Sequence, residues 1–197
     1  MNRIIKNIFN IKTKHLKRLM VSNKERKRFT RLSFFLRHCR EIPRLADGSV
    51  HVSDLMRSMK LEGDAFWSVV NASNLEKVRL EISEDGEWIS ALQGHSANLV
   101  ACPRLEPILS VKDVKAVRAV HATTEEAWSL IQESGELRPG TRQHVHFGLS
   151  DGVLRNRPVH LLLDVEAALA GECRLFRSKN GMLLCDGSLN VSFVKRI

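Results

Sequence analysis

Apolar side chains recur at helical spacing in the first part of the chain and alternate with polar ones in much of the second part. An amphipathic helix is predicted over residues 31–40, because apolar side chains recur there every three or four positions, at Leu32, Phe35, Leu36 and Cys39. Two further helices are predicted to begin at Ser53 and Asp64, since serine and aspartate are common N-caps, and the first of them to end near Met59.

A β-hairpin is predicted over residues 77–92, with Asp85-Gly86 as its turn. Its buried face pairs Ile82 with Ile89 and Leu80 with Ala91. A short strand over residues 49–52 follows another turn signal, Asp47-Gly48. Helices followed by a two-stranded wing predict a winged-helix-like lobe, an architecture that binds nucleic acids in some proteins and other proteins elsewhere.

The second half of the chain predicts strands joined by short helices. Thr123 and Glu126 form a capping box for a helix that ends at Gly135, and a second, alanine-rich helix ends at Gly171. Asn180-Gly181 is predicted as the turn of a second hairpin. Apolar runs predict the strands themselves, at residues 116–121, 144–147, 160–164, 174–178, 182–185 and 191–196.

A domain boundary is placed in residues 97–113, which contain Pro103 and Pro107 and show no clear hydrophobic period. The prediction is therefore an α+β chain in three parts. These are a basic N-terminal arm over 1–29, a winged-helix-like lobe over 30–98 and a β-rich lobe over 99–197.

Positive charge is concentrated near the N-terminus. Residues 1–31 hold eleven lysines and arginines and the single acid Glu25, a local charge of +10, whereas the whole chain is +9 and its remainder is therefore −1. Such a tail is typical of an arm that contacts nucleic-acid phosphates, and an organelle-targeting peptide is the alternative. No apolar run reaches the roughly 18 residues of a membrane helix, so no membrane span is predicted. Four scattered cysteines without CxxC spacing predict reduced thiols and a cytoplasmic protein.

Candidate chemistry gathers at Arg79 and at the segment Gln93-Gly94-His95-Ser96, which closes the predicted hairpin. The hairpin register places Arg79 on the face opposite to the buried one, one residue pair away from this loop. A guanidinium with three hydrogen-bonding side chains suits a phosphate or a ribose, because charge-assisted donors bind phosphate oxygens strongly. The alternative is a surface arginine beside an ordinary polar loop.

His121-Ala122-Thr123 is predicted to end a strand and to begin a helix. Free backbone amides at such a junction suit an anionic or amide-bearing ligand, and a simple capping role for Thr123 is the alternative. Arg37-His38 lies on the polar edge of the first predicted helix and, taken alone, indicates a solvated edge.

His144 and His146 point to one face of their predicted strand. A zinc site needs a third ligand, and no spacing signals one, so surface or ligand-facing histidines are favoured over a metal site. The chain has no GxGxxG motif after a strand and no Walker lysine motif, which argues against a doubly wound nucleotide-binding fold.

Taken together and in order, these segments resemble the RNA 2′-phosphotransferase family of the KptA type, over roughly residues 30–197. Each motif alone is weak, whereas the ordered combination is specific. The series consists of Leu36-Arg37-His38, Arg79, Gln93-Gly94-His95-Ser96, His121-Ala122-Thr123, Arg142-Gln143-His144-Val145-His146 and Phe176-Arg177-Ser178-Lys179-Asn180-Gly181.

The resemblance implies a winged-helix lobe that faces RNA and a lobe with the ADP-ribosyltransferase fold, with the site in the cleft between them. It implies an essential catalytic set of Arg37, His38, Arg79 and Arg142. It also implies NAD as cofactor, bound at positions that match Gln93, His95, Ser96, His121, Ala122, Thr123, His144 and His146. The nicotinamide-ribose end of NAD falls to the His121-Ala122-Thr123 segment.

Three positions depart from the family pattern. Ala122 stands in place of a glycine and adds a methyl group near the nicotinamide, and Ser90 stands where many members have an arginine that contacts substrate phosphate. The segment Phe147-Gly148-Leu149-Ser150 is longer than usual, so no contact to NAD is assigned to Ser150.

The implied reaction removes an internal 2′-phosphate from RNA, with RNA that bears this group as the partner of a monomeric chain. The 2′-phosphate attacks the ribose carbon that bears nicotinamide, and the ribose 2″-hydroxyl then attacks phosphorus to release RNA and ADP-ribose 1″,2″-cyclic phosphate. The hypothesis is that Arg37, Arg79 and Arg142 clamp the phosphate while His38 bonds a phosphoryl oxygen or protonates the leaving oxygen. Two alternatives stay open: an ADP-ribosyltransferase that modifies nucleic-acid phosphates, and a non-catalytic winged-helix nucleic-acid-binding protein.

Overall fold

The structure of the chain is a computed structural model that describes residues 23–75, 77–114, 118–148 and 157–197. The chain divides into two compact units, and the division falls between Ala91 and Leu92. Both units combine helices with small sheets, so the predicted α+β class is confirmed. No helix among the described residues is both long enough and apolar enough to span a membrane.

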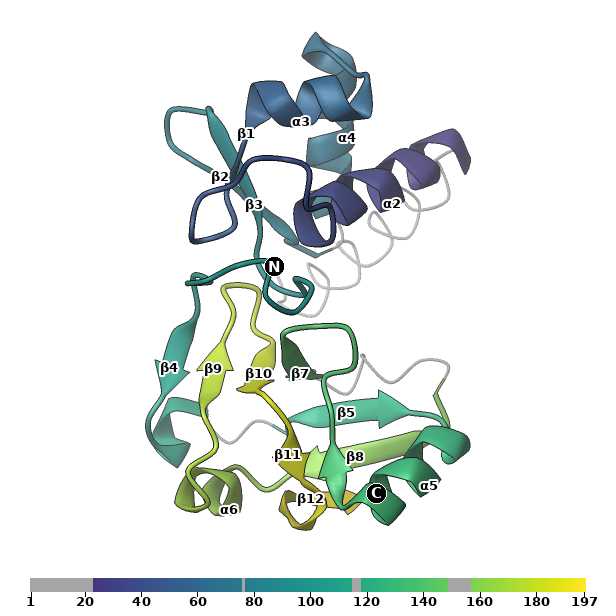
Figure 1. The fold of residues 1–197 in the computed structure, drawn as a ribbon, viewed down its shortest axis with the longest axis vertical. Coiled ribbons are helices and arrows are strands. Elements are labelled where there is room, and N and C mark those ends of the chain that lie inside the picture. Colours follow the sequence, from purple (N-terminus) through teal and green to yellow (C-terminus); the bar gives the residue numbers. More distant parts are fainter. Residues whose placement is uncertain (1–22, 76, 115–117, 149–156) are drawn as a thin grey trace, which may run out of the picture. The chain divides into compact units, whose positions relative to one another are not determined.

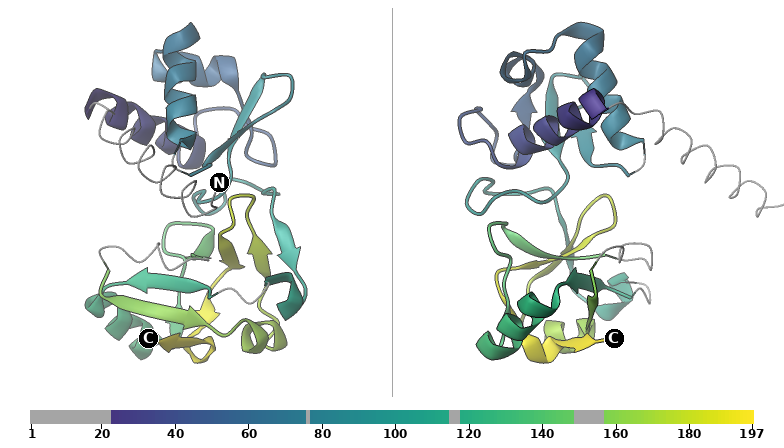
Figure 2. Two further views of the ribbon diagram at one scale, coloured as in Figure 1. Left: turned by 180° about the vertical axis from the view of Figure 1, so that it is seen from behind. Right: turned by 90° about the vertical axis from the view of Figure 1, so that its right-hand side faces the viewer.

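Within residues 23–75 and 77–91, the first unit packs three helices against a small antiparallel sheet, which has the strand order β1-β3-β2. Figures 1 and 2 show the helices gathered on one side of this sheet. Its elements are α2 (Asn23–Arg37), β1 (Val50–His51), α3 (Val52–Met59), α4 (Gly63–Asn74), β2 (Leu80–Ile82) and β3 (Trp88–Ala91). The core between helices and sheet is formed by apolar side chains from every element, among them Leu32, Leu36, Val50, Leu55, Phe66, Val70, Leu80 and Ile89.

The predicted hairpin has the observed register, because Ile82 pairs with Ile89 and Leu80 with Ala91. The turn itself is longer than predicted. The backbone amide of Ser83 donates to Trp88 at 2.9 Å, and that of Gly86 donates to Ser83 at 3.0 Å. Gly86 therefore ends the turn, with φ of 77°, and is not one of a central pair.

Three helix starts of the first unit differ from the prediction. Helix α2 is already formed at Asn23, because the charged residues that precede the apolar stripe lie on its exposed face. Helix α3 is capped by His51, whose ring accepts from the amide of Ser53 at 3.3 Å. His51 is held in an extended conformation by its pairing with Trp88, so the helix begins one residue before Ser53. Helix α4 has Glu62 at its N-cap, and Asp64 lies in its first turn.

The second unit is built mainly of short antiparallel strands. Two sheets have the orders β4-β9-β10-β7 and β12-β8-β5, and a small third pairs β11 with β6. The strands are β4 (Glu106–Ile108), β5 (Val120–Thr123), β6 (Glu136–Leu137), β7 (His144–Phe147), β8 (Val159–Leu163), β9 (Leu175–Arg177), β10 (Leu183–Asp186), β11 (Leu189–Asn190) and β12 (Val194–Arg196). The helices are α5 (Glu125–Ser134) and α6 (Val165–Ala170), with 3-10 turns η1 (Val111–Val114) and η3 (Val191–Phe193).

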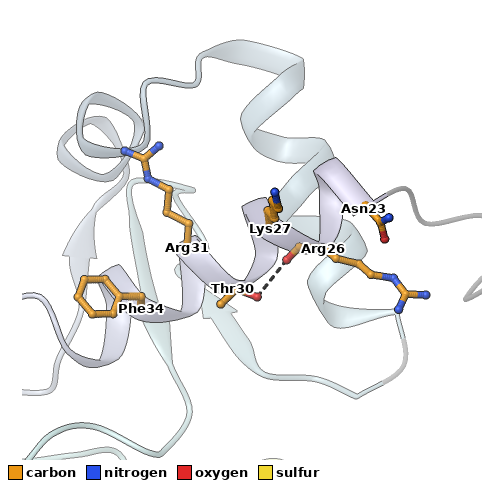
Figure 3. Close-up of a pocket in the computed structure, with 6 residues that line it drawn as sticks. All are labelled: Asn23, Arg26, Lys27, Thr30, Arg31 and Phe34. Carbon is orange, nitrogen blue, oxygen red and sulfur yellow. Dashed lines mark hydrogen bonds between the residues drawn. The ribbon is translucent and has the colours of Figure 1, made fainter.

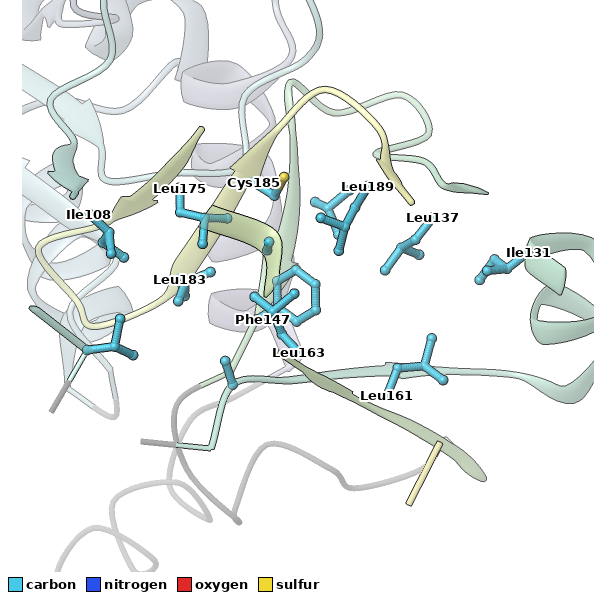
Figure 4. Close-up of a cluster of buried hydrophobic side chains, with 14 of the residues drawn as sticks. Ile108, Ile131, Leu137, Phe147, Leu161, Leu163, Leu175, Leu183, Cys185 and Leu189 are labelled. Carbon is cyan, nitrogen blue, oxygen red and sulfur yellow. The ribbon is translucent and has the colours of Figure 1, made fainter. Parts of the chain in front are cut away.

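An isolated bridge between described residues joins the two larger sheets. Val120 of β5 and Gly148 exchange two backbone hydrogen bonds of 2.9 and 2.8 Å, which places β5 beside the end of β7. Apolar side chains from both sheets then point toward one another (Figure 4). The core they form includes Phe147, Leu161, Leu163, Leu175, Leu183 and Leu189.

The second hairpin, the alanine-rich helix and the strand at 144–147 agree with the prediction. Strands β4, β6 and β11 were not predicted, because two or three residues carry too little pattern. The predicted strand 116–121 is displaced: the observed strand is Val120–Thr123, and residues 116 and 117 lie outside the described part of the chain. Only the end of the predicted strand 191–196 is extended, after the turn η3.

Candidate functional site

Arg37 and His38 lie at the C-terminal end of α2 in the first unit. Arg37 is the last helical residue, and both side chains are half-buried. The amide of His38 still donates to the carbonyl of Phe34, at 2.8 Å, so the chain turns only after this histidine. The rings of His38 and Phe34 lie 5.8 Å apart between centroids. The pair is therefore placed by the helix end and not on a fully solvated edge.

Arg79 is positioned by the end of helix α4. The side-chain oxygen of Asn74 accepts from the amides of Arg79 and Leu80, at 2.8 and 3.1 Å, and fixes the start of β2. The guanidinium of Arg79 donates to the carbonyl of Ser73 at 3.0 Å. The guanidinium group is thus hydrogen-bonded to the last turn of α4, where the helix dipole favours a cation.

Lys77 joins these two arginines in a cationic cluster, defined as Arg37, Lys77 and Arg79. Burial lowers the pKa of Lys77 from its ordinary value of 10.5, and the positive charges of Arg79 and then of Arg37 lower it further. Both guanidinium groups therefore act on one ammonium group, although α2 and β2 are distant in sequence. No sequence motif pointed to Lys77. Its position two residues before Arg79 was the available signal.

The loop Gln93-Gly94-His95-Ser96 lies against Arg142 within the second unit. The carbonyl of buried His95 accepts from the amide of Gln143 at 3.0 Å, and the amide of Ala97 donates to Thr141 at 3.1 Å. These two bonds hold Ser96 opposite Arg142. Gly94 has φ of 87°, a conformation that favours glycine, and it lets the chain turn into this contact. Gln93 and Ser96 are half-buried, whereas Arg142 is exposed.

The imidazole of His121 is held in place by a hydrogen bond and a ring contact within the second unit. Its Nδ1 donates to the carbonyl of His146 at 3.0 Å, and its ring lies edge-on to Phe147 at 5.9 Å. Burial lowers the pKa of His121 below its usual 6.5; the hydrogen bond to His146 opposes this, and the charges of Arg142 and Arg157 lower it further. The imidazole is therefore neutral at pH 7, with two cations in range. No sequence motif pointed to Arg157 either.

A strand ends and a helix follows at the predicted junction, His121-Ala122-Thr123, since β5 ends at Thr123 and α5 begins at Glu125, but the predicted N-cap is shifted by one residue. All three residues lie inside β5, where they pair with Leu161, His160 and Val159 of β8. The helix that follows is capped by Thr124, whose hydroxyl accepts from the amide of Ala127 at 3.2 Å. Sheet pairing therefore occupies this stretch of backbone, and Thr123 is a buried strand residue.

His144 and His146 lie on β7, opposite Asp186 and Leu184 of β10. His144 is buried and its ring is 6.2 Å from that of Phe176. Burial lowers the pKa of His144, the carboxylate of Asp186 raises it, and Arg174, which is ion-paired to Asp186, lowers it. His144 thus packs at the edge of the core. Across the ranges that the structure describes, no group of three potential metal-ligating side chains occurs.

Two of the departures from the family pattern can be placed. Ala122 is half-buried and lies opposite His160, and Ser90 is buried in β3 opposite Glu81. The small hydroxymethyl group of Ser90 takes the place that a long cationic side chain would have in the first unit. Ser150 lies outside the described residues.

These observations define a mixed α+β protein with a cationic cluster in one unit and a histidine and arginine group in the other. The chain belongs to the RNA 2′-phosphotransferase, Tpt1 / KptA family, whose model matches residues 5–187. The resemblance seen in the sequence motifs is therefore confirmed.

Relatives of this family span bacteria and eukaryotes. A probable RNA 2′-phosphotransferase of Agrobacterium fabrum is 32% identical over 169 residues, which cover 79% of this chain and 86% of the relative. The tRNA 2′-phosphotransferase of Saccharomyces cerevisiae is 24% identical, with 84% and 80% of the two chains covered. The human tRNA 2′-phosphotransferase 1 is 28% identical, with 80% and 67% covered.

Proposed function

We propose that this chain is an NAD-dependent enzyme that removes an internal 2′-phosphate from RNA of the tRNA splice-junction type. The products would be RNA with a free 2′-hydroxyl, nicotinamide and ADP-ribose 1″,2″-cyclic phosphate. Membership of a family of RNA 2′-phosphotransferases and the names of its relatives support this activity. The first unit would be a winged-helix-like RNA-binding lobe, and the second an ADP-ribosyltransferase-like lobe.

The cationic cluster is the observation that carries the proposal. Three like charges in half-buried positions are costly for the free protein, as the lowered pKa of Lys77 shows. A phosphate dianion removes this cost, because it accepts hydrogen bonds from both guanidinium groups and neutralises the cluster. The charge of the cluster therefore supports a phosphate dianion as its ligand, and the proposal assigns this site to the 2′-phosphate of RNA.

The second unit has a donor set that suits NAD. Arg142 and Arg157 supply positive charge for a pyrophosphate, and neutral His121 offers its Nε2 as an acceptor for a ribose hydroxyl or a carboxamide. The buried loop at His95 places Ser96 beside Arg142 as a further polar contact. Half-buried Ala122 adds a methyl group that a glycine would not, which predicts weaker binding of the nicotinamide end and not its exclusion.

NAD would supply the electrophilic ribose carbon and a good leaving group. The residues of this chain would do the rest. A phosphate dianion is already nucleophilic, so the first step needs positioning by Arg37 and Arg79 more than it needs a base. In the second step charge spreads over the phosphoryl oxygens, and preorganised guanidinium groups stabilise it. His38, adjacent to Arg37, would hydrogen-bond a phosphoryl oxygen or give a proton to the departing 2′-oxygen.

Turnover of an internally 2′-phosphorylated RNA, with and without NAD, tests the proposal. We expect turnover only with NAD, and a loss on the order of a hundredfold or more in Arg37→Ala, by analogy with removal of an oxyanion donor. Arg142→Ala should raise the KM for NAD, because it removes positive charge from the proposed pyrophosphate site. Release of inorganic phosphate without NAD would contradict it. An ADP-ribosylated RNA that persists would instead favour an ADP-ribosyltransferase, and RNA binding without NAD binding would favour a non-catalytic module.

A further inference from the structure

The exposed face of α2 carries a stripe of polar and basic side chains that the proposed chemistry does not use. Six residues line a pocket of about 640 Å3 on this face: Asn23, Arg26, Lys27, Thr30, Arg31 and Phe34. All six are exposed, and Figure 3 shows them strung along one helix. The opposite face of α2 is closed by Leu32 and Leu36, which are fully buried. The stripe is therefore the side of the helix that faces away from the core.

The stripe is basic and its side chains are ordered by local contacts. Arg31 donates to the carbonyl of Ser58 at 3.1 Å and lies over the ring of Phe35, 5.3 Å from its centroid. A guanidinium has five N–H donors, so this bond leaves Arg31 able to bind an anion as well. The hydroxyl of Thr30 donates to the carbonyl of Arg26 at 3.1 Å (Figure 3). Among the residues that the structure describes, no carboxylate lines this pocket, so three cations dominate its charge.

An aromatic ring ends the stripe beside a candidate catalytic residue. Phe34 is 52% exposed, so about half of its side chain is open to solvent. Its ring meets Phe35 edge-on at 6.0 Å and lies 5.8 Å from the ring of His38. An exposed ring that is held by two such ring contacts suits stacking with a nucleobase.

We propose that the stripe on α2 binds the single-stranded RNA that flanks the reacting nucleotide. Backbone phosphates would contact Arg26, Lys27 and Arg31, and a base would stack on Phe34 close to His38. The stripe is about 16 Å long, from the 1.5 Å rise per helical residue, which matches about four or five stacked nucleotides. This inference rests on the proposed function, because it assigns the path that the RNA strand follows along the protein away from the reacting 2′-phosphate.

The charge of the stripe favours RNA over the N-terminal arm of this chain as its ligand. The arm that precedes α2 has six lysines and arginines and no acid over residues 1–22, so it cannot neutralise the stripe. A polyanion with flat bases matches both features of the pocket, its cations and its exposed ring. An acidic peptide would match only the cations.

The proposal is tested by varying the length of the RNA substrate. We compare kcat/KM for a 2′-phosphorylated trinucleotide with that for single-stranded RNA about ten nucleotides long, extended on either side of the phosphate. Wild type should prefer the longer RNA, and Arg26→Gln/Lys27→Gln should reduce that preference on the order of tenfold. The slope of log(kcat/KM) against log of the salt concentration should become shallower by about 0.7 for each RNA phosphate that the variant no longer neutralises. Phe34→Ala should reduce the preference at least about fivefold without a change in this slope.

Arg57→Gln is the matched control, because Arg57 is an arginine of the same unit on α3 and 79% of its side chain is exposed. It should keep the wild-type length preference. An equal loss of preference in Arg57→Gln, or an unchanged preference in Arg26→Gln/Lys27→Gln, would overturn the proposal. If wild type turns over neither substrate, the proposed function fails, and fluorescence anisotropy with unphosphorylated RNA still tests the stripe. Binding there that is insensitive to Arg26→Gln/Lys27→Gln would overturn it.

Discussion

Replacing Arg79 with alanine separates the structural role of this residue from its proposed chemical one. In the folded protein, the substitution removes one hydrogen bond, from the guanidinium to the carbonyl of Ser73 at 3.0 Å. Such a bond contributes about 0.5–1.5 kcal/mol to stability. The substitution also removes the repulsion that lowers the pKa of Lys77, which offsets part of this loss. The free energy of unfolding should therefore fall by about 1 kcal/mol or less.

The catalytic loss should be much larger. If Arg79 holds a phosphoryl oxygen during transfer, its removal should raise the barrier by about 3 kcal/mol, a loss in rate of roughly 150-fold. Single-turnover kinetics with saturating NAD and a 2′-phosphorylated oligonucleotide measures the rate, and urea unfolding of the same variant measures stability. Arg79→Lys keeps the charge but loses the planar fork, so its rate should lie between those of wild type and Arg79→Ala.

The refuting result is specific. A rate for Arg79→Ala within about threefold of wild type, in a protein that unfolds as expected, would show that this guanidinium holds no reacting group. If the free energy of unfolding of Arg79→Ala fell by much more than expected, the loss in rate would be assigned to folding. The hydrogen bond from Arg79 to the carbonyl of Ser73 would then be the main role of the side chain.

Three further predictions follow from shifted pKa values. Lys77 has a lowered pKa in the folded state, so unfolding binds protons and stability rises with pH between that lowered pKa and 10.5; Lys77→Met should flatten this rise in urea unfolding curves and weaken stabilisation by added phosphate. His121 also has a lowered pKa, so its contribution to stability is present above 6.5 and is lost as the pH falls further; its ring should titrate below 6.5 by NMR, and a value above 7 would contradict burial as the cause. Burial raises the pKa of Cys185 to about 12, so iodoacetamide at pH 8 should modify exposed Cys102 and leave Cys185 unmodified until the protein is unfolded, as read by mass spectrometry.

The local elements of the fold were largely predictable, because alternating or helical patterns determine them. The register of the hairpin around Ile82 and Ile89 follows from one buried face, and a slip by one residue would expose that face. Helix starts were less predictable. His51 caps α3 with an imidazole nitrogen and Thr124 caps α5, whereas neighbouring Ser53 and Thr123 have equally suitable side chains. Which of two neighbouring residues becomes the N-cap is decided by where the preceding strand, β1 or β5, stops pairing with its neighbour in the sheet.

The candidate site depended on contacts between distant segments, which sequence patterns do not encode. Arg37, His38, Arg79 and Arg142 were found through motifs, but the role of Lys77 appears only when α2 and β2 lie in one unit. In the same way the neutral state of His121 follows from its burial and from the charges of Arg142 and Arg157, which outweigh the hydrogen bond to the carbonyl of His146. The roles of these residues toward NAD and RNA stay predictions.

The most direct test of the account follows the fate of the phosphorus atom itself. A substrate RNA carries radioactive phosphorus in a single internal 2′-phosphate, and the products are separated after incubation with the protein and NAD. We expect the label to leave the RNA and to appear in ADP-ribose 1″,2″-cyclic phosphate, in amounts equal to the nicotinamide released. Label recovered as inorganic phosphate, or retained on RNA while nicotinamide is released, would contradict it.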